Sequence, residues 1–240
     1  MPRSRQPWAI WLDDKMTEIT LDEIVLHDLK NPLSGITGNI GLFNDGLLGP
    51  LTAEQQARLI DIESSARKLS TMLSDLQAIN FFEKKELEPT LETFTAHQLL
   101  KELEWLPALA AKEEKSLNIS VDQNLTFKAD LPMITRILCN LLLNAIKQTP
   151  RGGQIACAIK REKGQILFEV IDQGDPLPEK LASETFNKEF KTLHPELRSR
   201  IAPALGFYFC KLAVEAHGGR ISMTTRSGQG SSYSFLLPQQ

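Results

Sequence analysis

The 240-residue chain lacks most of the features that mark membrane-spanning, secreted or nucleic-acid-binding proteins. No apolar run approaches the roughly 18 residues of a membrane span, and the start MPRSRQPWAIW has no signal-peptide core. The net charge is only −3, which gives no support for a nucleic-acid or anionic-membrane surface. We therefore expect a cytoplasmic protein with no membrane span in this chain and no nucleic-acid partner.

Cysteine is also scarce. The three cysteines, Cys139, Cys157 and Cys210, lie among apolar residues, without the spacing of a metal site or of a disulfide framework. We expect them to be buried thiols in a reducing compartment.

What the sequence does contain begins with two helical seams. Apolar residues recur at alternating steps of three and four over 26–47 and again over 59–76. The segment NDGLLGPLT (44–52) supplies the turn between them, and Thr52 with Gln55 forms a capping box. The pattern predicts a hairpin of two long helices that pairs with a second copy into a four-helix bundle. The alternative is a hairpin that packs on the C-terminal half of its own chain.

The first helix carries an unusual octapeptide, LHDLKNPL, at 26–33. Proline inside a helix removes a hydrogen bond and crowds the preceding turn, at a cost of about 3 kcal/mol. Because the seam continues beyond Pro32, we predict a kink and not the end of the helix. His27 follows the seam residue Leu26 and is turned about 100° off the buried stripe, given 3.6 residues per turn. We therefore expect the imidazole at the surface.

The periodicity changes after FEKKELEP (82–89), where short alternating strands replace the long seams. Helices are expected at 96–115, 131–149 (with Asp130 as its N-cap) and 205–219. Strands are expected at 90–94, 116–122, 152–162, 164–172, 220–226 and 231–238, with a hairpin at Lys163–Gly164, and the segment LTFKAD (125–130) leads into the helix at 131–149. The fold class is α+β, a helical hairpin followed by an α/β sandwich in which helices cover one face of a mixed sheet.

Three polar residues share one stripe of the helix at 131–149. Asn140, Asn144 and Lys147 follow at steps of four and three among leucines. Two asparagines alone could cap nearby loops, but amides on an apolar stripe are costly without partners. Because a lysine lies on the same face, an oxygen-rich ligand with a metal fits better. Amide oxygens suit Mg²⁺, and lysine suits phosphate.

Two further signals are weak by themselves. Asp172 ends a strand and is followed by Gly174, so its carboxylate could accept from an exocyclic amine such as that of adenine while the glycine lets the backbone approach the base. Gly206 stands just before a predicted helix, where free N–H groups favour a phosphate.

Together these motifs resemble the catalytic core of the sensor histidine kinases of two-component systems, over residues 20–238. The two most specific matches are H-[ED]-L-[KR]-x-P-L at 27–33 and N-L-L-x-N-A-x-K-x-T at 140–149. The resemblance implies a dimerisation and phosphoacceptor hairpin at 21–88 and a gyrase-like ATP-binding domain at 89–240. Residues 1–20 would be a linker or the end of an incoming signalling helix. The chain could be a fragment of a longer sensor or a protein that acts alone.

The resemblance also implies roles for single residues. In the hairpin, His27 would receive the γ-phosphoryl group of ATP, Asp28 would orient its ring, Lys30 would offset phosphate charge, and Asn31 would position a water that dephosphorylates the partner. In the second domain, Asn144 would coordinate Mg²⁺, Asn140 and Lys147 would contact the triphosphate, and Asp172, Gly174 and Gly206 would complete the nucleotide site. Related ATPases carry a glutamate base where this chain has Asn140. An amide cannot deprotonate water, so the arrangement favours phosphoryl transfer over hydrolysis.

The glycine boxes depart from the family pattern. The first reads Gly174, Asp175, Pro176, and the second, APALGF, keeps only Gly206. Proline cannot supply the positive φ or the close approach that glycine allows. Cationic residues of the intervening segment could meet phosphates: Lys188, Lys191, Arg198 and Arg200.

Three functions follow as hypotheses. The first is a protein-histidine kinase that uses ATP and Mg²⁺, forms a homodimer and passes the phosphoryl group to the receiver domain of a response regulator. The second is a degenerate kinase that serves as a phosphotransfer or scaffold module with weak or no ATP binding. The third is a member biased toward phosphatase activity, which Asn31 permits.

Overall fold

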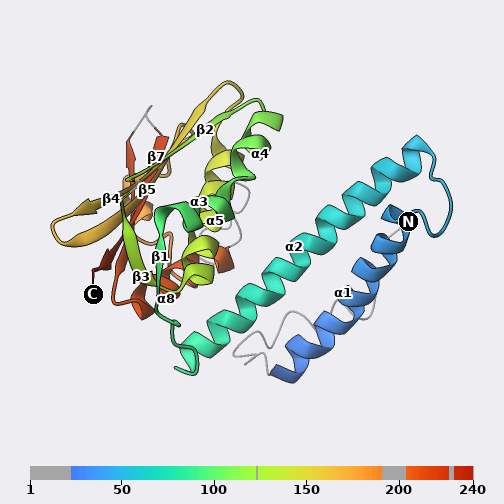
Figure 1. Cartoon of the computed structure of the whole chain (residues 1–240), viewed down its shortest axis with the longest axis horizontal. Coiled ribbons are helices and arrows are strands. Elements are labelled where there is room, and N and C mark those ends of the chain that lie inside the picture. Colours follow the sequence, from blue (N-terminus) through green and yellow to red (C-terminus); the bar gives the residue numbers. More distant parts are fainter. Residues whose placement is uncertain (1–22, 123, 191–203, 227–229, 240) are drawn as a thin grey trace, which may run out of the picture. The chain divides into compact units, whose positions relative to one another are not determined.

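The computed structural model describes residues 23–122, 124–190, 204–226 and 230–239 (Figure 1). Contacts divide the chain into two compact units, which meet between Asn80 and Phe81. This division lies inside a helix, whereas the boundary proposed from the sequence follows residue 88. The last turn of that helix therefore belongs to the second unit.

The first unit contains the predicted helical hairpin. Helix α1 spans Glu23–Asn44 and runs through Pro32, and helix α2 spans Ala53–Glu83. The predicted capping box is confirmed, because the Gln55 N–H donates to Thr52 Oγ1 over 3.2 Å and the Thr52 N–H donates to Gln55 Oε1 over 2.9 Å.

The apolar seams separate into two sets of positions. One set is buried: Leu26, Leu33, Ile40, Leu59 and Ala66, of which the last four form one cluster within the hairpin. The positions between them remain between 45% and 52% exposed: Leu29, Ile36, Ile62 and Leu69. The seam positions of each helix therefore lie on two different faces, one turned to the other helix of the hairpin and one left exposed. A single hairpin buries only the first of these faces.

The second unit contains the predicted mixed sheet. Its five strands lie in the order β2-β4-β5-β7-β6, in which β2 and β4 are parallel and the other neighbours are antiparallel. Their bounds are Ser116–Val121 (β2), Gln154–Glu162 (β4), Gln165–Asp172 (β5), Arg220–Arg226 (β6) and Gly230–Pro238 (β7). The β4–β5 turn lies at Lys163 and Gly164, whose φ angles of 49° and 78° fit a two-residue hairpin.

Two local predictions need correction. The helix expected at 96–115 is divided into α3 (Ala96–Leu103) and α4 (Leu106–Lys112), because Pro107 lacks the N–H that would continue the first helix and instead lies in the first turn of the second. The strands β1 (Glu92–Thr95) and β3 (Thr126–Ala129) form a separate antiparallel pair outside the five-stranded sheet.

Helices cover one face of the five-stranded sheet. Helix α5 spans Leu131–Gln148 and begins as predicted, with Asp130 Oδ1 accepting from the Met133 N–H over 2.9 Å. Helix α8 spans Ala204–Ala216, and the short α6 spans Glu179–Ala182. In Figure 1, α3, α4, α5 and α8 lie on the same side of the sheet. This is the predicted two-layer arrangement, and the described helices include none with the length and apolar character that a membrane crossing requires.

A row of phenylalanines forms the centre of the core and joins the two sheets. Phe94 and Phe127 of the small sheet stack at 5.0 Å between ring centroids. Phe127 reaches Phe168 of β5 at 5.7 Å, and Phe168 stacks on Phe235 of β7 at 4.3 Å. These buried ring contacts connect β1 and β3 to the main sheet without backbone pairing.

Candidate nucleotide site and phosphoacceptor helix

The three residues of the polar stripe of α5 differ in exposure. Asn144 is buried, with 2% of its surface exposed, Asn140 is half-buried, and Lys147 is exposed. The Asn144 side chain donates from Nδ2 to the hydroxyl of Tyr233 on β7 over 2.9 Å. The buried amide therefore has a partner from the sheet below it, which the sequence did not predict.

Gly206 is brought against this stripe. Asn140 Nδ2 donates to the Gly206 carbonyl over 3.4 Å. A Cβ placed on Gly206 would lie 3.2 Å from Asn140 Oδ1, so the absence of a side chain lets α8 approach α5 closely. Because α8 begins at Ala204, Gly206 lies in its first turn and not before the helix, as the sequence had suggested. The N–H groups of a first helical turn have no partner within the helix.

Asp172 ends β5 as a buried carboxylate with only 1% of its surface exposed. Its Oδ1 accepts from the Gly174 N–H over 2.7 Å, whereas Oδ2 is buried and has no hydrogen-bond partner among the described residues. Burial raises the pKa of Asp172 to about 6, against the lowering effect of the Gly174 and Ser231 N–H groups. The site thus holds an unused acceptor.

Gly174 closes the contact between β5 and the end of α5. A Cβ at this position would lie 2.8 Å from the Gln148 carbonyl oxygen and 2.9 Å from Asp172 Oδ1, closer than real Cβ atoms come. Two more buried polar atoms at this end of α5, Gln148 Nε2 and Thr149 Oγ1, also have no partner among the described residues. Each orphaned group costs about 1–3 kcal/mol, and such groups are retained where water or a ligand completes them.

The second unit thus brings together the residues that the sequence could only propose separately. The contacts Asn140–Gly206 and Gly174–Gln148 place both glycines against α5. Sequence reasoning missed three residues that belong to this site. Tyr233 accepts from Asn144, Gln148 has an unpaired side-chain nitrogen, and the Ser231 N–H lowers the pKa of Asp172. Thr149 closes the motif at 140–149, but the motif gave no sign of its unpaired hydroxyl. Tyr233 alternates with Phe235 on the inner face of β7, a pattern that predicts burial without predicting a polar contact.

The motif at 27–33, which the sequence predicts to be the phosphoacceptor, lies in the first turns of α1. His27 is within the helix, and the predicted orientation of its ring lies outside what the structure describes. Leu26 before it is buried, and Asp28, Asn31 and Pro32 are exposed. The Lys30 ammonium donates to Gln77 Oε1 on α2, so this lysine is held across the hairpin.

The remaining candidates do not join the nucleotide site. Lys188 donates to both carboxylate oxygens of Glu83, at 2.8 and 3.1 Å, and Glu83 also accepts from the Tyr208 hydroxyl at 3.0 Å. His217 is buried, with Nε2 accepting from the Asp130 N–H at 3.1 Å and Nδ1 2.7 Å from the Ala213 carbonyl. His97 is exposed. Three predicted residues lie outside the described part of the chain: Lys191, Arg198 and Arg200.

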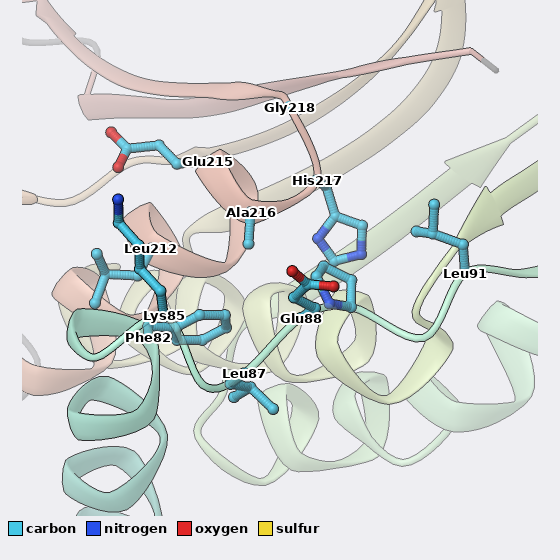
Figure 2. A pocket seen from close by; sticks show the side chains of 11 residues that line it. Phe82, Lys85, Leu87, Glu88, Leu91, Leu212, Glu215, Ala216, His217 and Gly218 are labelled. Atoms are coloured by element: carbon cyan, nitrogen blue, oxygen red, sulfur yellow. The ribbon is translucent and has the colours of Figure 1, made fainter.

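A separate pocket of about 650 Å³ lies between the segment after α2 and the end of α8 (Figure 2). Its walls are largely apolar, including Phe82, Leu87 and Leu212, with Lys85 and Glu215 among its charged residues. None of the predicted nucleotide-binding residues lines it. The orphaned acceptor of Asp172 and the amide stripe are better evidence of a ligand site than this open hollow, because they are polar groups that need a partner.

Comparison with known proteins finds two family matches, one in the helical hairpin and one in the unit that contains the sheet. Residues 23–81 match the model of the His Kinase A (phospho-acceptor) domain. Residues 129–240 match the model of the histidine kinase-, DNA gyrase B-, and HSP90-like ATPase family. The circadian input-output histidine kinase CikA of Synechococcus elongatus is 29% identical over 222 residues. The match covers 89% of this chain but 29% of that protein, so the chain spans less than a third of its relative.

Solved structures share the fold. Full-length ShkA in complex with AMPPNP has a TM-score of 0.72 and 23% identity, over 90% of this chain and 45% of that one. Histidine kinase ThkA, in complex with response regulator protein TrrA, has a TM-score of 0.58 and 21% identity, over 92% of this chain and 62% of that one. A phosphoacceptor hairpin followed by an ATPase domain, with a histidine kinase relative aligned along nearly the whole chain, establishes that this chain belongs to the sensor histidine kinases of two-component systems.

Proposed function

We propose that the chain is an ATP-dependent protein-histidine kinase. It transfers the γ-phosphoryl group of ATP to His27 and then to an aspartate on the receiver domain of a response regulator. The observation that carries the proposal is the buried, unpartnered Oδ2 of Asp172 beside the amide stripe of α5. A protein that had lost nucleotide binding would gain stability by replacing this carboxylate with an apolar residue.

The nucleotide is recognised from its two ends. At one end, Asp172 Oδ2 accepts from the exocyclic amine of adenine, and Gly174 lets the base approach. At the other end, Asn140 and Lys147 contact the phosphates, together with the N–H groups of the first turn of α8 around Gly206. Lys147 is exposed, so its ammonium can move to the phosphates without breaking a buried contact.

The donor set also fits Mg²⁺. The described residues contain no cluster of three or more histidine, cysteine, aspartate or glutamate side chains that could hold a metal by themselves. Mg²⁺ in phosphoryl-transfer sites takes few protein ligands, together with water and substrate phosphates. The amide oxygen of Asn144 would be such a ligand. The ion, when bound, neutralises charge that develops on the transferring phosphoryl group.

The chemistry at His27 is a direct displacement. An unprotonated ring nitrogen attacks the γ-phosphorus, the bond from that phosphorus to the bridging oxygen breaks, and ADP leaves with the electron pair. Asp28 holds the other ring nitrogen in its protonated form, which keeps the attacking nitrogen nucleophilic. Lys30 offsets the negative charge of the phosphohistidine, and Asn31 positions water during dephosphorylation of the partner.

The exposed half of the seams supports a homodimer. Leu29, Ile36, Ile62 and Leu69 present apolar surface on both helices at heptad spacing. A second hairpin would cover these positions and complete a four-helix bundle. The response regulator is proposed by analogy with ThkA, whose complex with TrrA shows a related kinase holding such a protein.

Incubation of the full chain with γ-³²P-labelled ATP and Mg²⁺ tests the proposal. We expect acid-labile label on the parent and none on His27→Gln. His97→Gln is the matched control, because it makes the same change at an exposed histidine outside the motif. Label that survives His27→Gln would assign the acceptor elsewhere, and an unlabelled parent would remove the kinase activity.

The sequence Gly174-Asp175-Pro176 favours a second candidate, the phosphotransfer or scaffold module with weak or no ATP binding. Titration calorimetry with a non-hydrolysable ATP analogue separates the two, because only the kinase gives a saturable signal. The phosphatase role of Asn31 is tested by comparing dephosphorylation of a phosphorylated regulator by the parent and by Asn31→Ala. Equal rates would dismiss that role.

A further inference from the structure

Tyr233 carries a hydroxyl at a buried position where an aromatic ring alone would fill the space. It lies on the inner face of β7, is 3% exposed, and pairs in register with Val170 of β5 and Met223 of β6. Its ring packs against Phe207 at 5.6 Å between centroids. A phenylalanine would fill the same space without the cost of burying a hydroxyl. The hydroxyl must therefore be explained by the contact that it makes.

That contact is with Asn144. The hydroxyl oxygen accepts from Asn144 Nδ2 over 2.9 Å, and both side chains are buried. The terminal torsion of asparagine has a broad energy profile, so the amide group can turn over easily. Its nitrogen and its oxygen have nearly the same shape and differ in that the nitrogen donates and the oxygen accepts. A partner that accepts from the nitrogen end fixes which way the amide turns.

Tyr233 is the acceptor in its contact with Asn144, and polar residues of β5 and β7 lie close to it. Ser231 lies two residues earlier on the same face of β7 and is opposite Asp172 in the register of β5 and β7. An amide nitrogen can only donate, so the Tyr233 oxygen accepts from Asn144 through a lone pair.

We infer that Tyr233 is a positioning residue for the metal end of the nucleotide site. Its hydroxyl holds the Asn144 amide so that the carbonyl oxygen serves Mg²⁺. The inference rests on the proposed function, because it assigns Asn144 to the ion. Partners that orient a metal ligand typically contribute ten- to a hundredfold in metal affinity. The loss should therefore fall on the metal-dependent part of nucleotide binding.

The test compares nucleotide affinity in Mg²⁺ with affinity in EDTA, using the full chain and a fluorescent ADP analogue. The ratio of the two affinities measures the metal-dependent part. Tyr233→Phe should lower this ratio about tenfold while affinity in EDTA changes less than twofold. The matched control is Tyr208→Phe, the same substitution at the chain's other tyrosine, whose hydroxyl bonds to Glu83 instead. Its ratio should equal that of the parent.

A double-mutant cycle separates positioning from a general structural effect. If Tyr233 acts through Asn144, then Tyr233→Phe should leave the ratio unchanged in a chain that already carries Asn144→Ala. A parent-like ratio in Tyr233→Phe overturns the inference, and so does an equal loss of affinity with and without the metal. A parent chain that binds no nucleotide under either condition would instead refute the proposed function.

The hydrogen bond can also be tested in the unmodified chain, should Tyr233→Phe fail to fold. Addition of Mg²⁺ to the ADP-bound chain should shift the Asn144 side-chain NH₂ resonances in a sample labelled with ¹⁵N-asparagine. These resonances should already lie away from those of exposed asparagines before the metal is added, because Nδ2 donates to Tyr233. Resonances that match those of solvent-exposed amides in both states would overturn the inference.

Discussion

Replacing Asp172 with asparagine should weaken nucleotide binding and at the same time remove a pH-dependent destabilisation. The folded carboxyl has a pKa of about 6, against 3.8 for an ordinary aspartate, chiefly because it is buried. Between these two values the folded chain holds a proton that the unfolded chain has released. Stability contributed by this proton is therefore present at low pH and is lost as pH rises toward 6.

The magnitude follows from the pKa difference. Each unit is worth about 1.4 kcal/mol, so the ionised carboxylate costs the folded state about 3 kcal/mol at pH 7. Asparagine does not ionise, so the variant has no such cost. The substitution also changes the free energy of unfolding by an amount that does not depend on pH. Beyond that amount, the free energy of unfolding of Asp172→Asn relative to the parent should rise by about 1.3 kcal/mol between pH 5 and pH 7 and then level off.

Calorimetric unfolding of the full chain without nucleotide, measured across this pH range, gives the difference directly. The transition to follow is the one that Mg²⁺-ATP shifts in the parent. The same variant should lose most of its affinity for adenine nucleotides, because an amide nitrogen would then face the exocyclic amine. A stability difference that does not change with pH would refute the reasoning, since it would mean that Asp172 does not titrate in this window.

Three further predictions concern packing. Gly174→Ala should destabilise the second unit by about 1–3 kcal/mol, because the new Cβ would meet the Gln148 carbonyl at 2.8 Å; thermal unfolding measures it. Leu69→Glu should dissociate the dimer in sedimentation experiments, because it places charge on the exposed half of the seam. Thr52→Ala should cost the hairpin about 1 kcal/mol in denaturant unfolding, through loss of the capping box.

Two of these predictions, for Gly174→Ala and for Leu69→Glu, have a control within the chain. Gly35→Ala lies in the interior of α1 with nothing within 4 Å of its new Cβ, so it should stabilise the hairpin by about 0.5–1 kcal/mol. Ile60→Glu changes a residue that is 58% exposed but lies off the seam, so the dimer should persist. A Gly174→Ala variant as stable as the parent, or a dimer indifferent to Leu69→Glu, would contradict the packing described above.

Much of the fold could be predicted from local pattern, and the limits of that prediction have physical causes. The hairpin followed from its seams, and the β4–β5 turn from Lys163–Gly164, because these signals act over a few residues. Periodicity could not tell which seam positions face the neighbouring helix and which remain exposed, since both have the same spacing. The pairing of β1 with β3 depends on the ring contact between Phe94 and Phe127, which lie far apart in the sequence.

The candidate site shows the same division. The amide stripe followed from helical geometry, because Asn140, Asn144 and Lys147 lie on one helix. The contact of Asn144 with Tyr233 joins residues 89 positions apart and could not be predicted from either segment alone. The unpaired oxygen of Asp172 is a property of packing, which the motif at a strand end does not encode.

The end of α2 determines where a fragment containing only the second unit should begin. Phe82 packs against Phe209 of α8 at 6.1 Å between centroids, and the guanidinium of Arg136 on α5 lies over the Phe209 ring, 4.2 Å from its centroid. Glu83 holds Lys188 and Tyr208. A fragment that starts at residue 89 would therefore lose an aromatic neighbour and a carboxylate that belong to its own packing. Excision of the nucleotide-binding part should begin upstream of Phe81, although the sequence alone suggests a later cut.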